Sequence, residues 1–358
     1  MPINVTKSYL PPLEEYTKQL ARVWESGWVT NNGPLALELE AKLKERFGVK
    51  HLFLLNNGTI ALQIAIKACG LSGEIITTPF SYVATTSSIK WEGCEPVFAD
   101  INPRTLSIDP AQIEKKITDK TTAILATHVY GIPTEVEKIQ AIAEKHHLRV
   151  IYDAAHAFDC SYKNKSLLSY GDVSTISFHA TKLFHTGEGG AIITSDDELA
   201  HKISYMRNFG HNGTEHFWGL GINGKNSELH AAMGLTVLPM VPEIIARRKE
   251  ISDQYDQAFA STSIQRPLMP ESLKYNYSYY PVILESEESL LKIRAALNHS
   301  DIFPRRYFFP SLNMLEYTGN QSAPFAEDIS KRVLCLPLYY ELQDEEVKLI
   351  TDIIQRNL

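Results

Sequence analysis

The feature that most constrains the fold is a regular alternation of short apolar runs with helical periods through about the first two-thirds of the chain. The runs are rich in β-branched residues and each closes on a polar residue, which is typical of strands buried on both faces. Strands that alternate with helices form a mainly parallel sheet with crossover helices. The predicted strands are 51–56, 74–78, 96–100, 123–127, 149–153, 174–178 and 191–195, with helical periods such as 60–69 and 135–146.

The regular alternation of predicted strands and helices ends after Gly234. A helical stretch at 242–261 leads into a mixed region with several prolines, and a second helical period at 288–300 precedes the apolar segment 333–339. At about 150 residues per domain, a chain of 358 residues corresponds to roughly two domains. We therefore expect a large α/β domain over residues 1–240 and a smaller α+β domain over residues 241–358.

Composition narrows the class of protein. Lys and Arg total 35 against 42 Asp and Glu, a net charge of −7, so we expect no nucleic-acid partner. Cys69, Cys94, Cys160 and Cys335 stand too far apart for zinc spacing, so we expect no metal site. No run approaches about 18 apolar residues and the N-terminal segment lacks a signal-peptide pattern. We therefore expect no membrane span and a cytoplasmic location.

One candidate phosphate site lies at residues 54–62, where an apolar strand runs into Asn-Gly-Thr and then into a helix. Gly58 allows close approach of the backbone, and the free N–H groups of a first helical turn attract phosphate. Taken alone, the pattern is better explained as a plain strand-to-helix turn with Thr59 as N-cap. The phosphate site therefore needs support from elsewhere in the chain.

Two later residues supply that support. Asp153 ends a predicted buried strand, where α/β sheets place ligand-binding groups. Lys182 lies four residues beyond the next predicted strand, between apolar neighbours and the GEGG run at 187–190. A desolvated lysine can form a Schiff base, and an aspartate facing a pyridinium nitrogen is its usual partner in pyridoxal phosphate (PLP) enzymes. Singly, Asp153 could instead cap a helix, and Lys182 could be a surface residue.

Together these elements resemble the nucleotide-sugar aminotransferases of the DegT family, which are fold-type I PLP enzymes. The resemblance covers nearly the whole chain, and no single piece of it is specific alone. It implies a large domain with a mainly parallel seven-stranded sheet and a smaller C-terminal α+β domain. The segments that carry it are 26–40, 56–63, 77–89, 126–133, 153–158, 177–190, 221–235 and 334–339.

The resemblance also implies roles for individual residues. Lys182 would hold PLP as a Schiff base and move the proton between cofactor and substrate, while Asp153 would keep the pyridine nitrogen protonated. Tyr82 would stack on the ring, and His156 would lie near the phenolic oxygen, where many relatives have glutamine. The phosphate would be held by Gly58, Thr59 and Ser177, joined by Asn223 from the partner subunit of a homodimer with shared active sites.

Some segments depart from the family pattern. Relatives often carry Asn-Tyr-Arg where this chain has Asn223, Gly224 and Lys225. Lys225 keeps a cation there, so it could contact a substrate diphosphate or could be a solvated loop residue. Arg306 and Tyr307 are further candidates for substrate binding, and the alternative is an ordinary loop-and-core segment.

The resemblance implies transfer of an amino group from glutamate to a nucleotide-linked ketosugar. The closest likeness is to enzymes acting at carbon 4 of dTDP-4-keto-6-deoxy-D-glucose for surface polysaccharides such as O-antigen and lipopolysaccharide. The first alternative is a 3-aminotransferase acting on a dTDP-3-keto-6-deoxyhexose. A ketosugar dehydratase of the family would carry histidine in place of Lys182, and a non-catalytic regulator would not need the lysine, the aspartate and the phosphate site together.

Overall fold

The computed structural model describes residues 2–358. The helices are α1 Leu13–Ser26, α2 Pro34–Phe47, α3 Gly58–Ala68, α4 Val83–Trp91, α5 Pro110–Glu114, α6 Val136–His146, α7 Asp197–Met206, α8 Glu228–Val237, α9 Val241–Phe259, α10 Glu287–His299, α11 Pro324–Arg332 and α12 Asp344–Asn357. The central strands are β2 His51–Leu55, β3 Glu74–Thr77, β4 Glu95–Phe98, β5 Thr121–Thr127, β6 Arg149–Asp153, β9 Val173–Ser177 and β10 Gly190–Thr194.

These seven strands form one sheet in the order β2-β10-β9-β6-β5-β3-β4. All neighbouring pairs are parallel except those of β10, which runs antiparallel to both β2 and β9. The predicted fold class, a mainly parallel seven-stranded sheet, is therefore confirmed. Because β9 and β10 are antiparallel neighbours, the segment between them forms a loop at one edge of the sheet, where the parallel strands end.

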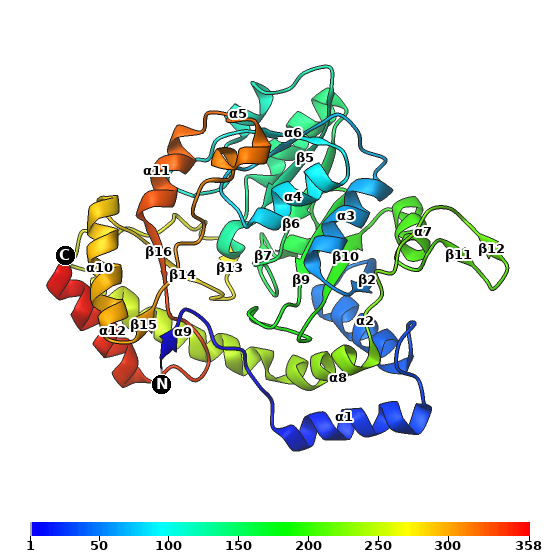
Figure 1. The fold of residues 1–358 in the computed structure, drawn as a ribbon, viewed down its shortest axis with the longest axis horizontal. Coiled ribbons are helices and arrows are strands. Elements are labelled where there is room, and N and C mark those ends of the chain that lie inside the picture. Colours follow the sequence, from blue (N-terminus) through cyan, green and yellow to red (C-terminus); the bar gives the residue numbers. More distant parts are fainter. Residues whose placement is uncertain (1) are drawn as a thin grey trace.

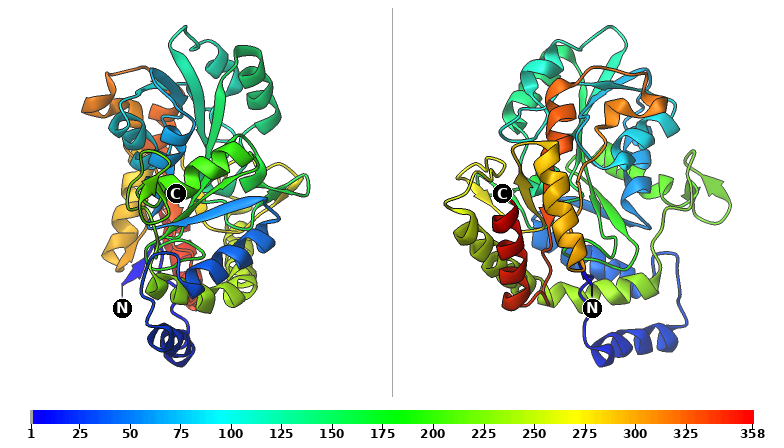
Figure 2. Two further views of the ribbon diagram at one scale, coloured as in Figure 1. Left: turned by 90° about the vertical axis from the view of Figure 1, so that its right-hand side faces the viewer. Right: turned by 60° about the vertical axis from the view of Figure 1, so that its left-hand side comes forward.

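Helices cover both faces of this sheet (Figures 1 and 2). Helices α3, α4 and α7 pack on one face, and α2 and α8 together with α5 and α6 pack on the other. Successive residues of β10 point to opposite faces of the sheet, since Ile192 packs in the apolar cluster with α3 and Ile193 packs in the apolar cluster with α2. Burial on both faces explains why the strands read as continuous apolar runs.

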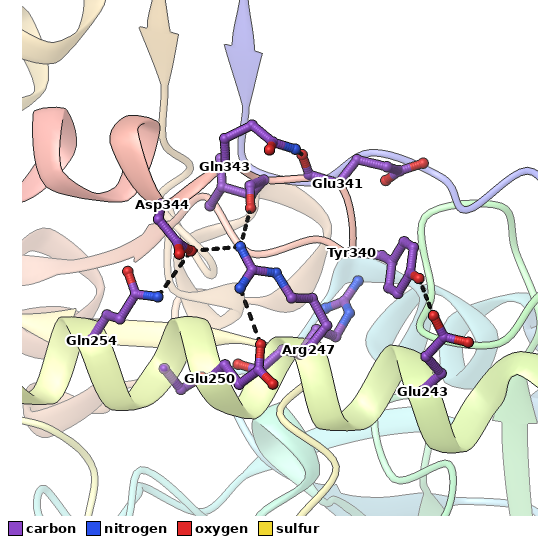
Figure 3. A network of polar contacts seen from close by, with 11 residues as sticks. Glu243, Arg247, Glu250, Gln254, Tyr340, Glu341, Gln343 and Asp344 are labelled. Carbon is purple, nitrogen blue, oxygen red and sulfur yellow. Dashed lines mark hydrogen bonds and ion pairs between the residues drawn. The ribbon is translucent and has the colours of Figure 1, made fainter.

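The C-terminal region has its own apolar cluster. Strands β14 Tyr280–Ile283 and β16 Val333–Leu336 pair antiparallel, and α9, α10 and α12 pack around them. Strand β1 Ile3–Asn4 pairs with β15 Ile302–Phe303, so the start of the chain lies beside this region. On the surface, Arg247 of α9 donates to Asp344, the first residue of α12, at 2.7 Å, and Gln254 donates to the same carboxylate at 2.9 Å (Figure 3). These contacts join two helices that lie far apart in the sequence.

Helices α8 and α9 continue as one long helix, Glu228–Phe259, that runs beneath the sheet (Figure 1). By length and composition alone this helix could cross a membrane, yet half of its most apolar window is buried inside the protein. Its apolar side chains pack against α1 and α2 and against the C-terminal cluster. Core packing therefore accounts for its composition.

The remaining strands are short. Strands β7 Ser161–Tyr162 and β8 Lys165–Ser166 form a small sheet with β13 Leu273–Lys274. Strands β11 His211–Asn212 and β12 His216–Phe217 form a hairpin that projects from the body of the protein between α7 and α8 (Figure 1).

Candidate active site

The predicted site residues gather at the edge of the sheet where its parallel strands end. Asp153 is the last residue of β6, the central strand, and Ser177 is the last residue of β9. Lys182 lies in the loop between β9 and β10, and Tyr82 is the N-cap of α4, which follows β3. Parallel strands bring their carboxyl ends to one edge, so residues up to 100 positions apart meet there.

The loop that carries Lys182 is held at its base by the continuing ladder of β9 and β10. The amide of Phe178 donates to the carbonyl of Gly189 at 2.8 Å, and the amide of Ala180 donates to that of Gly187 at 2.7 Å. A Cβ on Gly190 would lie 2.7 Å from the carbonyl carbon of Asn57, so glycine is required for β10 to begin against the start of α3. The GEGG run thus serves backbone packing that places Lys182.

The environment of Lys182 favours its neutral form. The side chain is half-buried, and burial lowers the pKa of its ammonium group, partly opposed by the negative charge of Asp153. Its Nζ donates to the hydroxyl of Tyr279 at 3.4 Å. Burial raises the pKa of Tyr279, so this phenol stays neutral at physiological pH. A neutral lysine amine is the form that attacks a carbonyl.

Asp153 is only 5% exposed, and each of its oxygens accepts one hydrogen bond from the protein. The hydroxyl of Thr85 donates to Oδ2 at 2.7 Å, and the amide of Ala155 donates to Oδ1 at 3.1 Å. Burial raises the pKa of the Asp153 carboxyl, while both hydrogen bonds and the charge of Lys182 lower it. The carboxylate therefore keeps unused acceptor capacity that suits a cationic N–H.

His156 lies beside Tyr279, with ring centroids 4.8 Å apart, and stacks on Phe308 at 5.8 Å. Burial lowers the pKa of His156 well below its usual value, so the ring is neutral. The amide of Tyr130 donates to its Nδ1 at 3.1 Å, which places the ring proton on Nε2. Its Nε2–H is a donor suited to a phenolate oxygen.

The predicted phosphate site has free donors. Asn57, not Thr59, caps α3, with its side chain accepting from the amide of Ile60 at 2.8 Å. Within residues 2–358, the amides of Gly58 and Thr59 donate to no acceptor. A Cβ on Gly58 would lie 3.0 Å from the Cβ of Ser177, so the start of α3 and the end of β9 adjoin. These groups fit a phosphate dianion at a helix N-terminus.

Two predicted substrate residues have other partners in the structure. Arg306 is largely buried, where it pairs with Glu287 at 2.6 Å and donates to the carbonyl of Lys331. Lys225 is 7% exposed and donates to Oδ1 of Asn223 at 2.8 Å. Arg306 is thus held away from the other site residues by acceptors of its own, whereas Lys225 lies beside Asn223, another predicted site residue.

Tyr307 and Asn223 remain accessible to a ligand. Tyr307 packs edge-on against Tyr279 at 5.9 Å, and both line a small cavity of ≈ 20 Å³ together with Thr6 and Thr181, the neighbour of Lys182. Asn223 is exposed in the loop before α8, at the base of the β11–β12 hairpin. Within residues 2–358, no group of three or more His, Cys, Asp and Glu side chains is arranged to hold a metal ion.

Two polar residues of the site escaped the sequence analysis. Thr85 lies three residues after Tyr82, on the first turn of α4. The only sequence feature that could have pointed to Thr85 is this spacing from an aromatic residue at the helix start. Tyr279 lies in the segment 275–280, which holds four tyrosines. Its role at Lys182 depends on contact between segments 97 residues apart, which no local pattern reveals.

A half-buried lysine in the loop between two antiparallel strands, a strand-end aspartate and a helix-N-terminal phosphate site on this fold define a fold-type I PLP enzyme. Residues 13–355 match the DegT/DnrJ/EryC1/StrS aminotransferase family, and the chain belongs to that family.

Known relatives are similar to this chain over nearly its whole length. A dTDP-4-amino-4,6-dideoxy-D-glucose transaminase of Shigella dysenteriae is 42% identical over 364 residues, 99% of this chain and 98% of that relative. DesI, solved in the presence of its TDP-sugar product, matches with a TM-score of 0.94 and 32% identity over 99% of this chain and 92% of that one. Spr1654 of Streptococcus pneumoniae, solved in a PLP form, matches with a TM-score of 0.92, 25% identity and complete coverage of both chains. The predictions of a nucleotide-sugar aminotransferase and of PLP as its cofactor are confirmed.

Proposed function

We propose that the chain transfers the amino group of glutamate to carbon 4 of dTDP-4-keto-6-deoxy-D-glucose. The products are 2-oxoglutarate and dTDP-4-amino-4,6-dideoxy-D-glucose, so nitrogen and electrons balance between the two half-reactions. The observation that carries the proposal is the half-buried Lys182, near enough to Asp153 for the carboxylate to affect its pKa and at the same edge of the sheet as the phosphate site. The full-length likeness to a transaminase named for this amino sugar supports the choice of substrate.

Some residues of the site would bind the cofactor, and Lys182 would also transfer the proton. Bound PLP supplies an electron-withdrawing ring that takes up the electron pair released when the substrate C–H bond breaks. Asp153 would accept the ring N–H, and Tyr82, which is 57% exposed, would stack on the ring. Lys182 would hold the cofactor and carry the proton to and from the substrate carbon, with Tyr279 orienting its Nζ.

The phosphate and the phenolic oxygen are held by neutral donors. The amides of Gly58 and Thr59 and the hydroxyls of Thr59 and Ser177 would bind the phosphate at the positive end of α3. The Nε2–H of His156 donates to the phenolic oxygen. Together these residues would hold the cofactor at both ends, and this would help to orient the substrate bond that breaks.

We also propose a homodimer in which Asn223 completes the phosphate site of the partner subunit. The support is a set of large apolar side chains exposed around the hairpin next to Asn223: Phe209, Phe217, Trp218, Leu220 and Ile222. Apolar side chains gathered on one projection mark an interaction surface. A symmetric interface would place each hairpin against the other copy.

The dimer is tested by mixing two inactive variants, Lys182→Ala and Asn223→Asp, the second of which places a carboxylate against the phosphate. After subunit exchange, one site of each heterodimer carries both lesions and the other carries neither. Activity should therefore return on mixing. Verified exchange without recovered activity would show that Asn223 acts within its own subunit or not at all.

The substrate is tested with a panel of ketosugars that vary in one feature at a time. We expect turnover of glutamate with dTDP-4-keto-6-deoxy-D-glucose to exceed that with a dTDP-3-keto-6-deoxyhexose, and dTDP to be preferred to GDP or UDP. Glutamate alone should convert the bound cofactor and bleach its violet absorption. Preferred turnover of the 3-ketosugar would overturn the carbon-4 assignment and leave the aminotransferase class intact.

We further propose that the product serves surface-polysaccharide synthesis, such as that of O-antigen or lipopolysaccharide, from the cytoplasm. A nucleotide-activated amino sugar is suited to glycosyl transfer. Loss of the amino sugar from the polysaccharide of a strain lacking this chain is the expected result. An unchanged polysaccharide in that strain would remove this assignment.

A further inference from the structure

The Asp153 carboxylate stands at the end of a chain of three buried hydroxyl groups. Thr85 Oγ1 donates to Asp153 Oδ2 at 2.7 Å. Ser81 Oγ lies 2.8 Å from Thr85 Oγ1 and 3.0 Å from Thr127 Oγ1. All three hydroxyl residues are at most 1% exposed. They come from α4, from the segment before it and from the end of β5, so three elements converge on one carboxylate.

The direction of these hydrogen bonds follows from the charge at their end. An ionised carboxylate only accepts, so the single hydroxyl hydrogen of Thr85 is committed to Asp153. Thr85 must then accept from Ser81, and Ser81 must accept from Thr127. The order Thr127 to Ser81 to Thr85 to Asp153 points every hydroxyl dipole at the carboxylate, and this arrangement stabilises its ionised form.

We propose that Thr85, supported by Ser81 and Thr127, is a positioning residue that keeps Asp153 ionised and aimed at the ring nitrogen of the cofactor. This inference rests on the proposed role of Asp153. Thr85 is fully buried and acts through its hydrogen bond to the carboxylate. No arginine or lysine forms an ion pair with Asp153 within residues 2–358, so its direct partners are a hydroxyl and an amide donor, with the charge of Lys182 as a further, smaller stabilising influence.

The chain offers a matched control one residue along the same helix. Thr86 is 0% exposed, like Thr85, yet its Oγ1 has no hydrogen-bond partner within the described residues. The changes Thr85→Val and Thr86→Val therefore make the same substitution at equal burial. Only the first removes a donor to Asp153. The change Thr85→Ser keeps that donor while removing a methyl group.

The experiment reconstitutes each variant with PLP labelled with ¹⁵N in its ring and records the ¹⁵N chemical shift, which reports protonation of the ring nitrogen. Hydrogen bonds to charged groups are worth roughly tenfold or more in an equilibrium constant. We expect Thr85→Val to move the signal toward that of an unprotonated pyridine and to weaken PLP binding about tenfold. Thr85→Ser should restore both properties, and Thr86→Val should change neither.

Thermal unfolding of each cofactor-free variant separates positioning from folding. An unchanged ¹⁵N signal in a folded Thr85→Val protein would overturn the inference, as would an equal change in Thr86→Val. If Thr85→Val does not fold, Ser81→Ala takes its place, with a smaller signal change in the same direction expected and no change contradicting the inference. An unchanged signal in Asp153→Asn would instead refute the proposed role of Asp153 itself.

Discussion

Two aspartates of this protein lie in opposite environments. Asp344, at the start of α12, has a side chain that is 62% exposed and accepts hydrogen bonds from Arg247 and Gln254 (Figure 3). Asp153, at the end of β6, is 5% exposed and accepts from a hydroxyl and an amide. Hydrogen bonds from Gln254 and Arg247 lower the pKa of Asp344, whereas burial raises the pKa of Asp153.

The difference in burial and charge compensation distinguishes a polar contact between two helices from a functional site. At Asp344 an arginine compensates the charge, and water screens what remains, so the contact fixes one helix against another and does little else. At Asp153 the protein has buried a carboxylate without a paired cation, which costs stability. Such a cost is explained when a bound group, here the cofactor's ring N–H, supplies the missing positive charge.

The largest expected contrast comes from removing the basic residue that interacts with each aspartate, Lys182 for Asp153 and Arg247 for Asp344. Lys182→Ala should abolish transamination and leave the fold intact, because Lys182 provides both the bond to the cofactor and the proton transfer. Arg247→Ala should leave kcat within about twofold, since an exposed ion pair contributes little. Steady-state kinetics with glutamate and the ketosugar check both. Near-normal turnover by Lys182→Ala would contradict the proposed mechanism.

A second contrast neutralises each carboxylate in turn. Asp153→Asn should slow both half-reactions by about 100-fold or more, because a neutral amide does not stabilise a protonated ring nitrogen. Asp344→Asn should leave both half-reactions unchanged. Rapid mixing with glutamate, followed through the cofactor absorption, measures the first half-reaction. A wild-type rate in Asp153→Asn would reassign Asp153 as a structural residue.

These contrasts also show how far the sequence alone could lead. The seven strands were predictable because burial on both faces leaves continuous apolar runs, and Lys182 and Asp153 were predictable because each follows such a run. Thr85 was not, since its partner Asp153 lies 68 residues away and only the sheet order brings them together. Arg306 could not be placed for the same reason, because its partner Glu287 comes from α10, which no local pattern sets beside it.

Ionisation of the two aspartates should change the stability of the fold in opposite directions, and the change should be larger for the buried Asp153. A raised folded-state pKa means that stability is lost as pH rises from the usual value of about 3.9 through the folded-state value. At pH 7 the cofactor-free Asp153→Asn protein should therefore melt at a higher temperature than the wild type, and this advantage should vanish near pH 3. Calorimetry at both pH values provides the measurement. A lower melting temperature at pH 7 would contradict an unpaired buried charge.

The smallest expected effect is that of Asp344→Asn on stability. A lowered folded-state pKa gives stability that is present above the usual value of about 3.9 and is lost as pH falls through the folded-state value. Because the side chain is mostly exposed, the loss at pH 7 should be less than about 1 kcal/mol. Urea unfolding at pH 7 and pH 3 should show the difference only at pH 7. A difference that persists at pH 3 would assign it to lost packing.

The central claim is that PLP is bound covalently at Lys182, beside Asp153. Borohydride reduction of the PLP-loaded protein, followed by proteolysis and mass spectrometry, tests this claim most directly. The account predicts a pyridoxyl group on the peptide that contains Lys182, and none on that peptide in Lys182→Ala. A pyridoxyl group on another lysine of the wild type, or none at all in a protein that turns over glutamate, would contradict it.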